Sequence, residues 1–335
     1  MFTEAEAGLR AIVAIHDTTM GPACGGTRIW PYASDEEALG DVLLLARAMT
    51  NKSAVAGLNI GGGKAVLIAD PDPGLDEALL RAFGRCLNTL EGRFLTTADV
   101  GGTGRDMEIV SRETDYVAGL PVSRGGSGDS SIMSGLGLYF GMKACAKAVW
   151  GSDSLRGRRI AMQGFGKVGT RAAVHLLAEG ARVVATALHD STMRKARSMG
   201  VEVVAPEEIY DVDCDIFSPC ALGGVINRDT IPRLTCQIVA GAANNQLATA
   251  TDGDELHRLG ILYAPDFVIN AGGIINLSVE VGRPYDPEVA RAKTEGIYGV
   301  VEQVVQASRR EGMPTTWAAN RLAEERLAAA RSAWS

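Results

Sequence analysis

The sequence has few of the residues that bind metal ions or form disulfides. Its four histidines show no H-x-x-x-H pattern, and its six cysteines include no C-x-x-C pair. Scattered thiols in a large chain are typical of reduced core cysteines in the cytoplasm. We therefore predict a cytoplasmic protein with no metal site.

Long hydrophobic runs and strongly basic segments are also missing. No apolar stretch approaches the roughly 18 residues that a membrane span requires, and the first residues, MFTEAEAGLR, lack the basic and apolar regions of a signal peptide. The net charge of -7 argues against nucleic acid or an anionic membrane as a partner. At 335 residues, the chain is long enough for two domains that each bury a core.

The most unusual stretch is MTNKSAVAGLNIGGGK, residues 49–64, which carries Lys52 and Lys64 with no acidic residue between them. Three glycines stand directly before Lys64, and an apolar run over residues 65–69 follows. We expect the glycines to turn the backbone sharply into a buried strand. A lysine held there has little access to water, which suits base chemistry. The alternative is a pair of solvated surface lysines, the commoner arrangement for two arbitrary lysines.

The residues before this stretch indicate a strand, a loop and a helix. Residues 9–16 have the pattern of a strand, and residues 21–28, GPACGGTR, that of a glycine-rich loop ending in a cation. Ser34 and Glu37 form a capping box for a helix that ends near Lys52. Helical spacing predicts a buried stripe on this helix, made of Leu39, Val42, Leu43, Ala46, Met49 and Ser53.

A single acidic residue follows the next short strand. Residues 76–90 favour a helix and residues 94–97 a strand, and Asp99 lies just past its end, before a pair of glycines. Proteins of the α/β class place functional groups at such strand ends. Asp99 is therefore a candidate functional residue, although an aspartate in this position taken alone is more often a turn residue or a helix cap.

The second half of the chain carries a dinucleotide-binding pattern. Residues 124–131, RGGSGDSS, are polar and flexible and mark a domain boundary. After a helix over residues 134–149, the pattern Gly164-x-Gly166-x-x-Gly169 stands between a strand and an amphipathic helix. This order is typical of a Rossmann unit, in which free N–H groups at the helix start bind the pyrophosphate.

Further strand and helix units follow this pattern. Residues 214–220, 237–240 and 261–263 indicate strands, and polar segments over 241–246 and 270–276 follow two of them. Asparagines at the carboxyl ends of such strands offer donors and acceptors to a nicotinamide amide or a substrate amine. Asparagine in a tight turn is an equally good interpretation of each.

Together these motifs resemble the amino-acid dehydrogenase family that includes leucine, valine, phenylalanine, tryptophan and glutamate dehydrogenases, and most closely its leucine dehydrogenases. The resemblance covers nearly the whole chain. The runs that carry it are AIHDTTMGPACGGTRIW, GLNIGGGKAV, IFSPCALGG, IVAGAANNQL, APDFVINAGGIIN and RLAEER. Runs of this length in this order are highly specific.

The resemblance implies an α/β protein with two domains and a cleft between them. Residues 1–130 would form an N-terminal substrate-binding, catalytic and oligomerisation domain. Residues 131–310 would form a Rossmann NAD(P)-binding domain, and residues 311–335 a C-terminal helix that packs back on the first domain. The protein would be a homo-oligomer whose small-molecule partners are an L-amino acid, its 2-oxo acid and ammonia.

The resemblance also implies roles for individual residues. Lys64 and Asp99 would be catalytic, with Lys64 polarising the α-carbonyl group and Asp99 moving protons to and from the amine. Lys52 would bind the α-carboxylate. The other residues that resemble substrate-binding positions are Cys24, Gly25, Met49, Thr97, Asn245 and Ile274. The residues that resemble cofactor-binding positions are Ser134, Gly164, Gly166, Lys167, Val168, Gly169, Ala187, His189, Ala221, Asn244 and Asn270.

Several positions depart from the family pattern. Cys24 replaces a bulky leucine, which would enlarge the side-chain pocket, and Ser134 keeps the hydroxyl of the usual threonine. Ala187 stands where an acid normally accepts a hydrogen bond from the 2′-hydroxyl of the NAD ribose. We therefore expect NAD to be used, NADP to be possible, and discrimination against NADP to be weaker than in the family. The alternative is that Asp190, three residues further on, or a backbone group takes over.

Two other functions stay open at this point. The chain could be a non-catalytic, nucleotide-binding regulatory descendant, or a biosynthetic reductive aminase for an unusual oxo acid. Because Lys64 and Asp99 are both present, we favour an NAD(P)-dependent oxidoreductase that interconverts an apolar or aromatic L-amino acid with its 2-oxo acid.

Overall fold

A computed structural model describes residues 1–334, which form two compact units. The first unit contains Met1–Asp129, Asn276–Pro287 and the chain from Ala323 onwards, and the second contains Ser130–Ile275 and Glu288–Leu322. Residues 276–287 were expected to belong to the Rossmann domain and residues 311–322 to lie outside it. In the structure, residues 276–287 pack with the first unit and residues 311–322 with the second.

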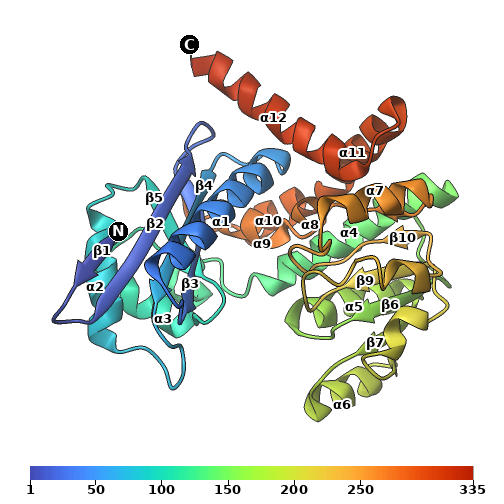
Figure 1. The fold of residues 1–335 in the computed structure, drawn as a ribbon, viewed down its shortest axis with the longest axis horizontal. Coiled ribbons are helices and arrows are strands. Elements are labelled where there is room, and N and C mark those ends of the chain that lie inside the picture. The colour runs from blue at the N-terminus through green and yellow to red at the C-terminus, as the bar shows by residue number, and fades with distance from the viewer. Residues whose placement is uncertain (335) are drawn as a thin grey trace. The chain divides into compact units, whose positions relative to one another are not determined.

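Five strands form the sheet of the first unit: β1 (Phe2–Glu4), β2 (Leu9–Asp17), β3 (Ala23–Trp30), β4 (Gly61–Ile68) and β5 (Phe94–Ala98). Their order across the sheet is β1-β2-β4-β3-β5 (Figure 1). β2 pairs antiparallel with β1 and β4, whereas β3 runs parallel to both β4 and β5. Because β3 lies between β4 and β5, residues of these two strands stand on either side of it.

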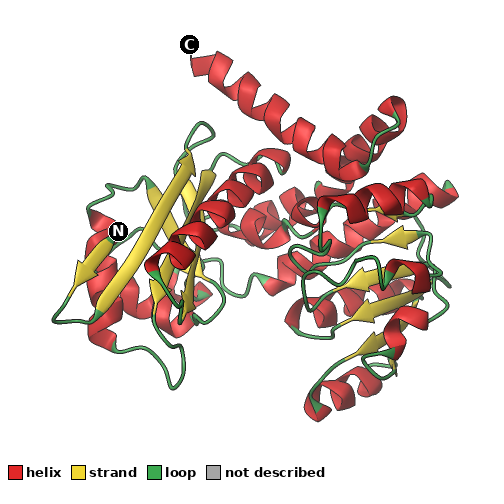
Figure 2. Ribbon diagram, in the orientation of Figure 1, coloured by secondary structure: helices red, strands yellow, loops and turns green. Residues whose placement is uncertain are grey.

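Helices cover both faces of this sheet (Figure 2). They are α1 (Asp35–Val55), α2 (Glu77–Asn88) and α3 (Gly104–Val110), with a short turn η1 (Val122–Arg124). Alternate residues of a strand point to opposite faces. Accordingly, Ile12 of β2 packs in one core with Val42 of α1, whereas Leu9 and Ala11 share the other core with Phe83 of α2. The sheet is therefore buried between α1 on one side and α2 on the other.

Two predictions about glycine-rich segments are wrong. Residues 21–28 were expected to form a loop, but Ala23–Trp30 are β3, an internal strand of the sheet. The glycines before Lys64 were expected to form a turn, but β4 begins at Gly61 and includes all three of them.

Close packing explains these strand glycines. A Cβ atom on Gly26 would lie 2.6 Å from the Cβ of Asp99, and one on Gly63 would lie 2.8 Å from the ring of Phe94. The space that a side chain would need is thus already filled by neighbouring residues. A glycine inside a strand often marks such a close approach.

The expected buried stripe of α1 is wrong at three positions. Leu39 and Leu43 are 45% and 53% exposed, and Met49 is half-buried. Val42, Ala46 and Ser53 are buried as expected, together with Ala38, Thr50, Ala54 and Val55. Most of the buried residues are small, so the helix can lie close to β4. The larger side chains of Leu39 and Leu43 lie outside this contact and are exposed. The capping box is also incomplete, because Glu37 accepts the N–H of Ala33 at 2.8 Å rather than that of Ser34.

Six parallel strands form the sheet of the second unit: β6 (Arg159–Gln163), β7 (Arg182–Thr186), β8 (Glu202–Val203), β9 (Ile216–Pro219), β10 (Ile238–Val239) and β11 (Leu262–Tyr263). Their order is β11-β10-β9-β6-β7-β8 (Figure 1). The chain builds outward from β6 in one direction and then in the other, which is the doubly wound Rossmann arrangement. The predicted α/β fold class is confirmed.

The remaining helices are α4 (Ser131–Trp150), α5 (Lys167–Glu179), α6 (Asp190–Ser198), α7 (Ala250–Arg258), α8 (Asp266–Ile269), α9 (Gly272–Ser278), α10 (Pro287–Glu295), α11 (Ile297–Glu311) and α12 (Thr315–Trp334), with the short turns η2 (Glu208–Asp211) and η3 (Ile231–Arg233). Within residues 1–334, no helix has both the length and the apolar character needed to cross a bilayer.

Candidate active site

The centre of the first unit's sheet holds an ion pair between Lys64 and Asp99. Lys64 lies within β4 and is 7% exposed, and Asp99 directly follows β5. β3 separates these two strands, and its Gly26 leaves room for the Asp99 side chain. The glycine in the intervening strand thus allows two charged groups to meet across it. The family resemblance associates these two residues in one reaction, and the structure adds their direct contact.

Several charges act on the Asp99 carboxyl. Burial alone would raise its pKa. The Lys64 ammonium opposes this through its charge and its hydrogen bond, and the Val100 N–H and the Arg28 guanidinium add to the effect, so that the pKa of Asp99 is lowered overall. Asp99 is therefore an ionised carboxylate, with no proton of its own to donate.

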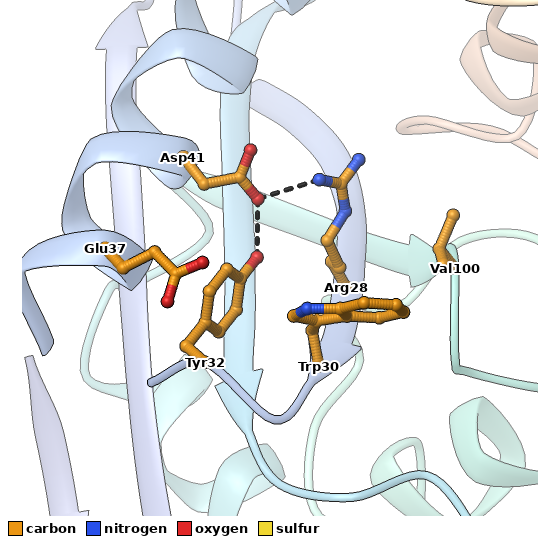
Figure 3. Close-up of a pocket in the computed structure, with 6 residues that line it drawn as sticks. All are labelled: Arg28, Trp30, Tyr32, Glu37, Asp41 and Val100. Atoms are coloured by element: carbon orange, nitrogen blue, oxygen red, sulfur yellow. Dashed lines mark hydrogen bonds and ion pairs between the residues drawn. The ribbon is translucent and has the colours of Figure 1, made fainter. Parts of the chain in front are cut away.

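Arg28 lies on β3, the strand between those of Lys64 and Asp99, and a contact with α1 fixes its side chain (Figure 3). Its Nη1 donates to Asp41 of α1 at 2.7 Å, and the hydroxyl of Tyr32 donates to the same carboxylate oxygen. Figure 3 shows Arg28 and Tyr32 converging on Asp41, beside the indole of Trp30. The sequence analysis noted Arg28 only as the end of a loop. Its position on β3, beside the strand that leads to Asp99, depends on pairing between strands that are distant in sequence.

Lys52 lies in the last turn of α1, which packs tightly on β4. A Cβ atom on Gly62 would overlap the backbone of Thr50, so this glycine lets the end of the helix approach the strand. Arg326 of α12 donates to the carbonyls of Ala54, at 3.3 Å, and Val55. Cationic side chains stabilise the C-terminal carbonyls of a helix in this way. The turn that carries Lys52 is therefore held by β4 and by Arg326.

The other predicted substrate-binding residues divide between the two units. Cys24, Gly25, Met49 and Thr97 belong to the first unit, and Asn245 and Ile274 belong to the second. Cys24 is fully buried, and burial raises the pKa of its thiol to about 12. This thiol is therefore neutral and is not activated as a nucleophile.

The glycine pattern in the second unit lies where β6 ends and α5 begins. Gly164 has a φ of 103° and packs against Ala221, and Gly166 is the N-cap of α5. The first turn of α5 contains Lys167, Val168 and Gly169. No side chain caps this helix start, so its N–H groups are open to an anion such as a pyrophosphate.

A cavity of about 530 Å³ opens beside this helix start. Its lining includes Gly164, Gly166, Ala187, His189 and Ala221, all predicted to bind the cofactor, and also Gln163, Phe165, Thr186, Leu188, Thr192, Pro206, Glu207, Tyr210, Cys220, Leu222 and Arg233. The side-chain oxygens of Gln163 and Thr186 are buried here without a hydrogen-bond partner. Because buried polar groups are normally paired, these two oxygens fit a polar ligand such as a dinucleotide.

The remaining predicted residues lie elsewhere in the second unit. Asn270 donates to the side chain of Asn244 at 2.8 Å, while its own amide oxygen is buried without a partner. Ser134 donates to the carbonyl of Ser130 at 3.0 Å. Asn245 has a φ of 51°, in the left-handed region that asparagine often adopts in turns. The alternative of asparagine in a tight turn therefore fits Asn245. Among residues 1–334, there is no group of three or more potential ligands placed to bind a metal ion.

Comparison with known proteins agrees with this geometry. The model of the Glu/Leu/Phe/Val dehydrogenase dimerisation domain matches residues 2–116, and that of Glutamate/Leucine/Phenylalanine/Valine dehydrogenase matches residues 125–202 and 188–334. The leucine dehydrogenase of Bacillus subtilis strain 168 is 51% identical over 96% of this chain and 88% of that protein. The valine dehydrogenase of Streptomyces coelicolor is 45% identical over 97% of this chain and 90% of that protein.

A solved structure shows the same fold. The L-tryptophan dehydrogenase of Nostoc punctiforme has a TM-score of 0.86 and 43% identity, covering 97% of this chain and 94% of that one. The substrates of the family are amino acids and 2-oxo acids, and a nicotinamide cofactor takes part in the reaction. The chain therefore belongs to the Glu/Leu/Phe/Val dehydrogenase family and is an amino-acid dehydrogenase, an oxidoreductase acting on a CH–NH₂ group.

Proposed function

We propose that this protein converts an apolar or aromatic L-amino acid reversibly to its 2-oxo acid and ammonia, with NAD and, less efficiently, NADP. The observation that carries the proposal is the largely buried ion pair of Lys64 and Asp99. A proton donor and a proton acceptor held together away from water can act on the same substrate, as general acid–base catalysis requires.

Three charged residues have separate roles in this proposal. Lys52 binds the α-carboxylate through a charge-assisted hydrogen bond. Lys64 Nζ donates to the α-carbonyl oxygen and, in the deaminating direction, activates the water that adds to the iminium carbon. Asp99 accepts a proton from the substrate ammonium and returns it to the amine in the reverse reaction. Its lowered pKa keeps Asp99 ionised beside Lys64 before the substrate binds.

The nicotinamide cofactor supplies the hydride acceptor or donor when it is bound. The open N–H groups at the start of α5, next to Gly164 and Gly166, would hold its pyrophosphate. Ser134 and the unpartnered oxygen of Asn270 are our candidates to hold its carboxamide. Because Ala187 brings no carboxylate to the cavity, we propose that NADP is excluded less strongly than by a site with an acid at this position.

The substrate class gives the first test. Turnover of a panel of 2-oxo acids with ammonia and each reduced cofactor can be followed by the absorbance of the reduced nicotinamide. We expect the oxo acids of leucine, valine and phenylalanine to react faster than 2-oxoglutarate. The positions assigned to the side-chain pocket carry no cation, and they are Cys24, Met49, Thr97 and Ile274. An unpaired carboxylate buried there would cost several kcal/mol. Faster turnover of 2-oxoglutarate would reject the proposed substrate class.

Lys52→Ala is expected to raise KM for 2-oxo acids with a smaller effect on kcat. Loss of a hydrogen bond between two charged groups corresponds to a rise of about ten- to a hundredfold. Arg47→Ala is the matched control, because Arg47 is an exposed cation on the same helix. If steady-state kinetics gave the same KM for Lys52→Ala as for the unmodified protein, another group would have to bind the carboxylate.

We further propose that the protein is a homo-oligomer. The description of the model matching residues 2–116 as a dimerisation domain supports this. Sedimentation velocity measures the mass of the particle directly, and a species with the mass of one chain at micromolar concentration would contradict the proposal.

A further inference from the structure

The cofactor cavity of the second unit continues past Ala187, where the usual acid is missing. Ala187 directly follows β7, and β8 lies beside β7 with Val203 paired to Ala185. The segment after β8 carries Glu207, and both Ala187 and Glu207 line the cavity. Two parallel strands that end side by side place the residues that follow them at the same edge of the sheet. An acidic residue therefore lines this cavity from the segment after the neighbouring strand, whereas the position after β7 carries none.

Arg233 holds the segment that carries Glu207. Its Nη2 donates to the backbone carbonyl of Glu207 at 2.6 Å and pairs with Asp211 at 2.7 Å. The guanidinium also lies 5.1 Å from the ring centroid of Tyr210. These contacts fix the backbone of Glu207 and do not use its carboxylate, which belongs to an exposed residue at the cavity wall.

The neighbouring acids are placed differently. The carboxylate of Glu208 accepts the backbone N–H of Ala205 at 3.1 Å, and Asp211 pairs with Arg233. Asp190 is the first residue of α6 and is exposed. Among the described residues that line the cavity, Glu207 is the one acid.

The charges around the cavity disfavour a second phosphate. Arg233 is a cation at the wall, but Asp211 already neutralises it through two hydrogen bonds, at 2.9 Å and 2.7 Å. With Arg233 and Asp211 paired, the carboxylate of Glu207 leaves a net negative charge on this side of the cavity. A 2′-phosphate placed here would meet a like charge, and Arg233, the one lysine or arginine among the described lining residues, is already paired.

We propose that Glu207 accepts the hydrogen bond of the adenosine ribose in place of the acid missing at Ala187, and that it is the residue that disfavours NADP. The inference rests on the proposed function, because it concerns the cofactor of that reaction. The carboxylate stands on an exposed segment after β8, so it excludes a phosphate less strictly than an acid fixed directly at the end of β7 would.

Binding of the reduced cofactors tests this directly, without any substrate. Dissociation constants for NADH and NADPH are measured by nicotinamide fluorescence for the unmodified protein and for Glu207→Gln. In Glu207→Gln we expect the preference for NADH to fall by about tenfold or more, the usual effect of losing a hydrogen bond to a charged group. Because Glu207 is exposed, the substitution leaves the core of the unit unchanged.

Two further variants separate this effect from a general disturbance. Asp190→Asn removes the acid that is closer in sequence, and we expect its NADH preference to match that of the unmodified protein. The double variant Glu207→Gln, Ala187→Asp returns an acid to the end of β7, and we expect it to regain the preference. An unchanged NADH preference in Glu207→Gln, or a loss of it in Asp190→Asn, would overturn the proposal.

Failure of this proposal can be told apart from failure of the proposed function. If no 2-oxo acid is turned over but Glu207→Gln still shifts the binding preference, the function is wrong and the role of Glu207 stands. If turnover is normal and the preference does not change, the role of Glu207 is wrong and the function stands.

Discussion

Lys64→Ala lowers kcat by about 10²–10⁴-fold, the usual loss for a group that transfers protons, while NADH binding stays within a small factor of the unmodified protein. Lys64 lies on the sheet of the first unit, whereas the glycine pattern lies in the second. The substitution also removes the charge that lowers the pKa of Asp99, so the pKa of that carboxyl rises in the variant. We expect Asp99→Asn to cause a loss of the same order, because the pair then lacks its proton acceptor.

The measurement is kcat with a saturating 2-oxo acid, ammonia and NADH, together with NADH fluorescence. Lys143→Ala is the control, because Lys143 is also a partly buried lysine, paired with Glu179 at 3.1 Å in the second unit. Its kcat should be close to that of the unmodified protein. If Lys64→Ala or Asp99→Asn kept nearly full kcat, we would withdraw the catalytic roles.

Gly25→Ala prevents the first unit from folding normally, although it adds only one methyl group. A Cβ at Gly25 would overlap the carbonyl oxygen of Gly63 and lie 2.8 Å from its carbonyl carbon. Both partners are backbone atoms of paired strands in the centre of a sheet, so neither can move without breaking the sheet. Overpacking typically costs about 1–3 kcal/mol where side chains can adjust, and more is expected against backbone. A stability of 5–15 kcal/mol is typical of a whole domain.

Thermal unfolding measured by circular dichroism tests this, with Gly40→Ala as the matched control. Gly40 lies in α1 with open space around its Cβ position. An alanine there should stabilise the helix by about 1 kcal/mol. A Gly25→Ala variant with the melting temperature of the unmodified protein would show that β3 and β4 are farther apart than described here.

Hydrophobic periodicity and glycine content predicted some elements well and others poorly. The strand before Asp99 and the glycine pattern at Gly164 follow from neighbours in sequence, and both lie where they were expected. β3 was expected to be a loop, because a segment with two glycines in succession has no strand propensity of its own. Its strand conformation comes from β4 and β5, which approach so closely that only glycine fits at Gly25 and Gly26.

The cavity beside the start of α5 shows the same limit. Gly164, Gly166 and Ala187, which line it, could be predicted as one group because each stands at a fixed distance from the others in a Rossmann pattern. The same cavity is also lined by Glu207, in the segment after β8, and by Arg233 of η3. Glu207 and Arg233 come together because of the order of the strands and because Arg233 donates to the carbonyl of Glu207. Neither feature can be predicted from residues close together in sequence.

The first unit is assembled from three separate parts of the chain, and this has a consequence for how it folds during synthesis. Its sheet is complete in sequence after β5, but Arg326 of α12 is the residue that holds the carbonyls at the end of α1, one turn from Lys52. A ribosome makes Arg326 only after the entire second unit. The N-terminal sheet can therefore form early in translation, whereas the turn that carries Lys52 gains its final support only when the last helix emerges.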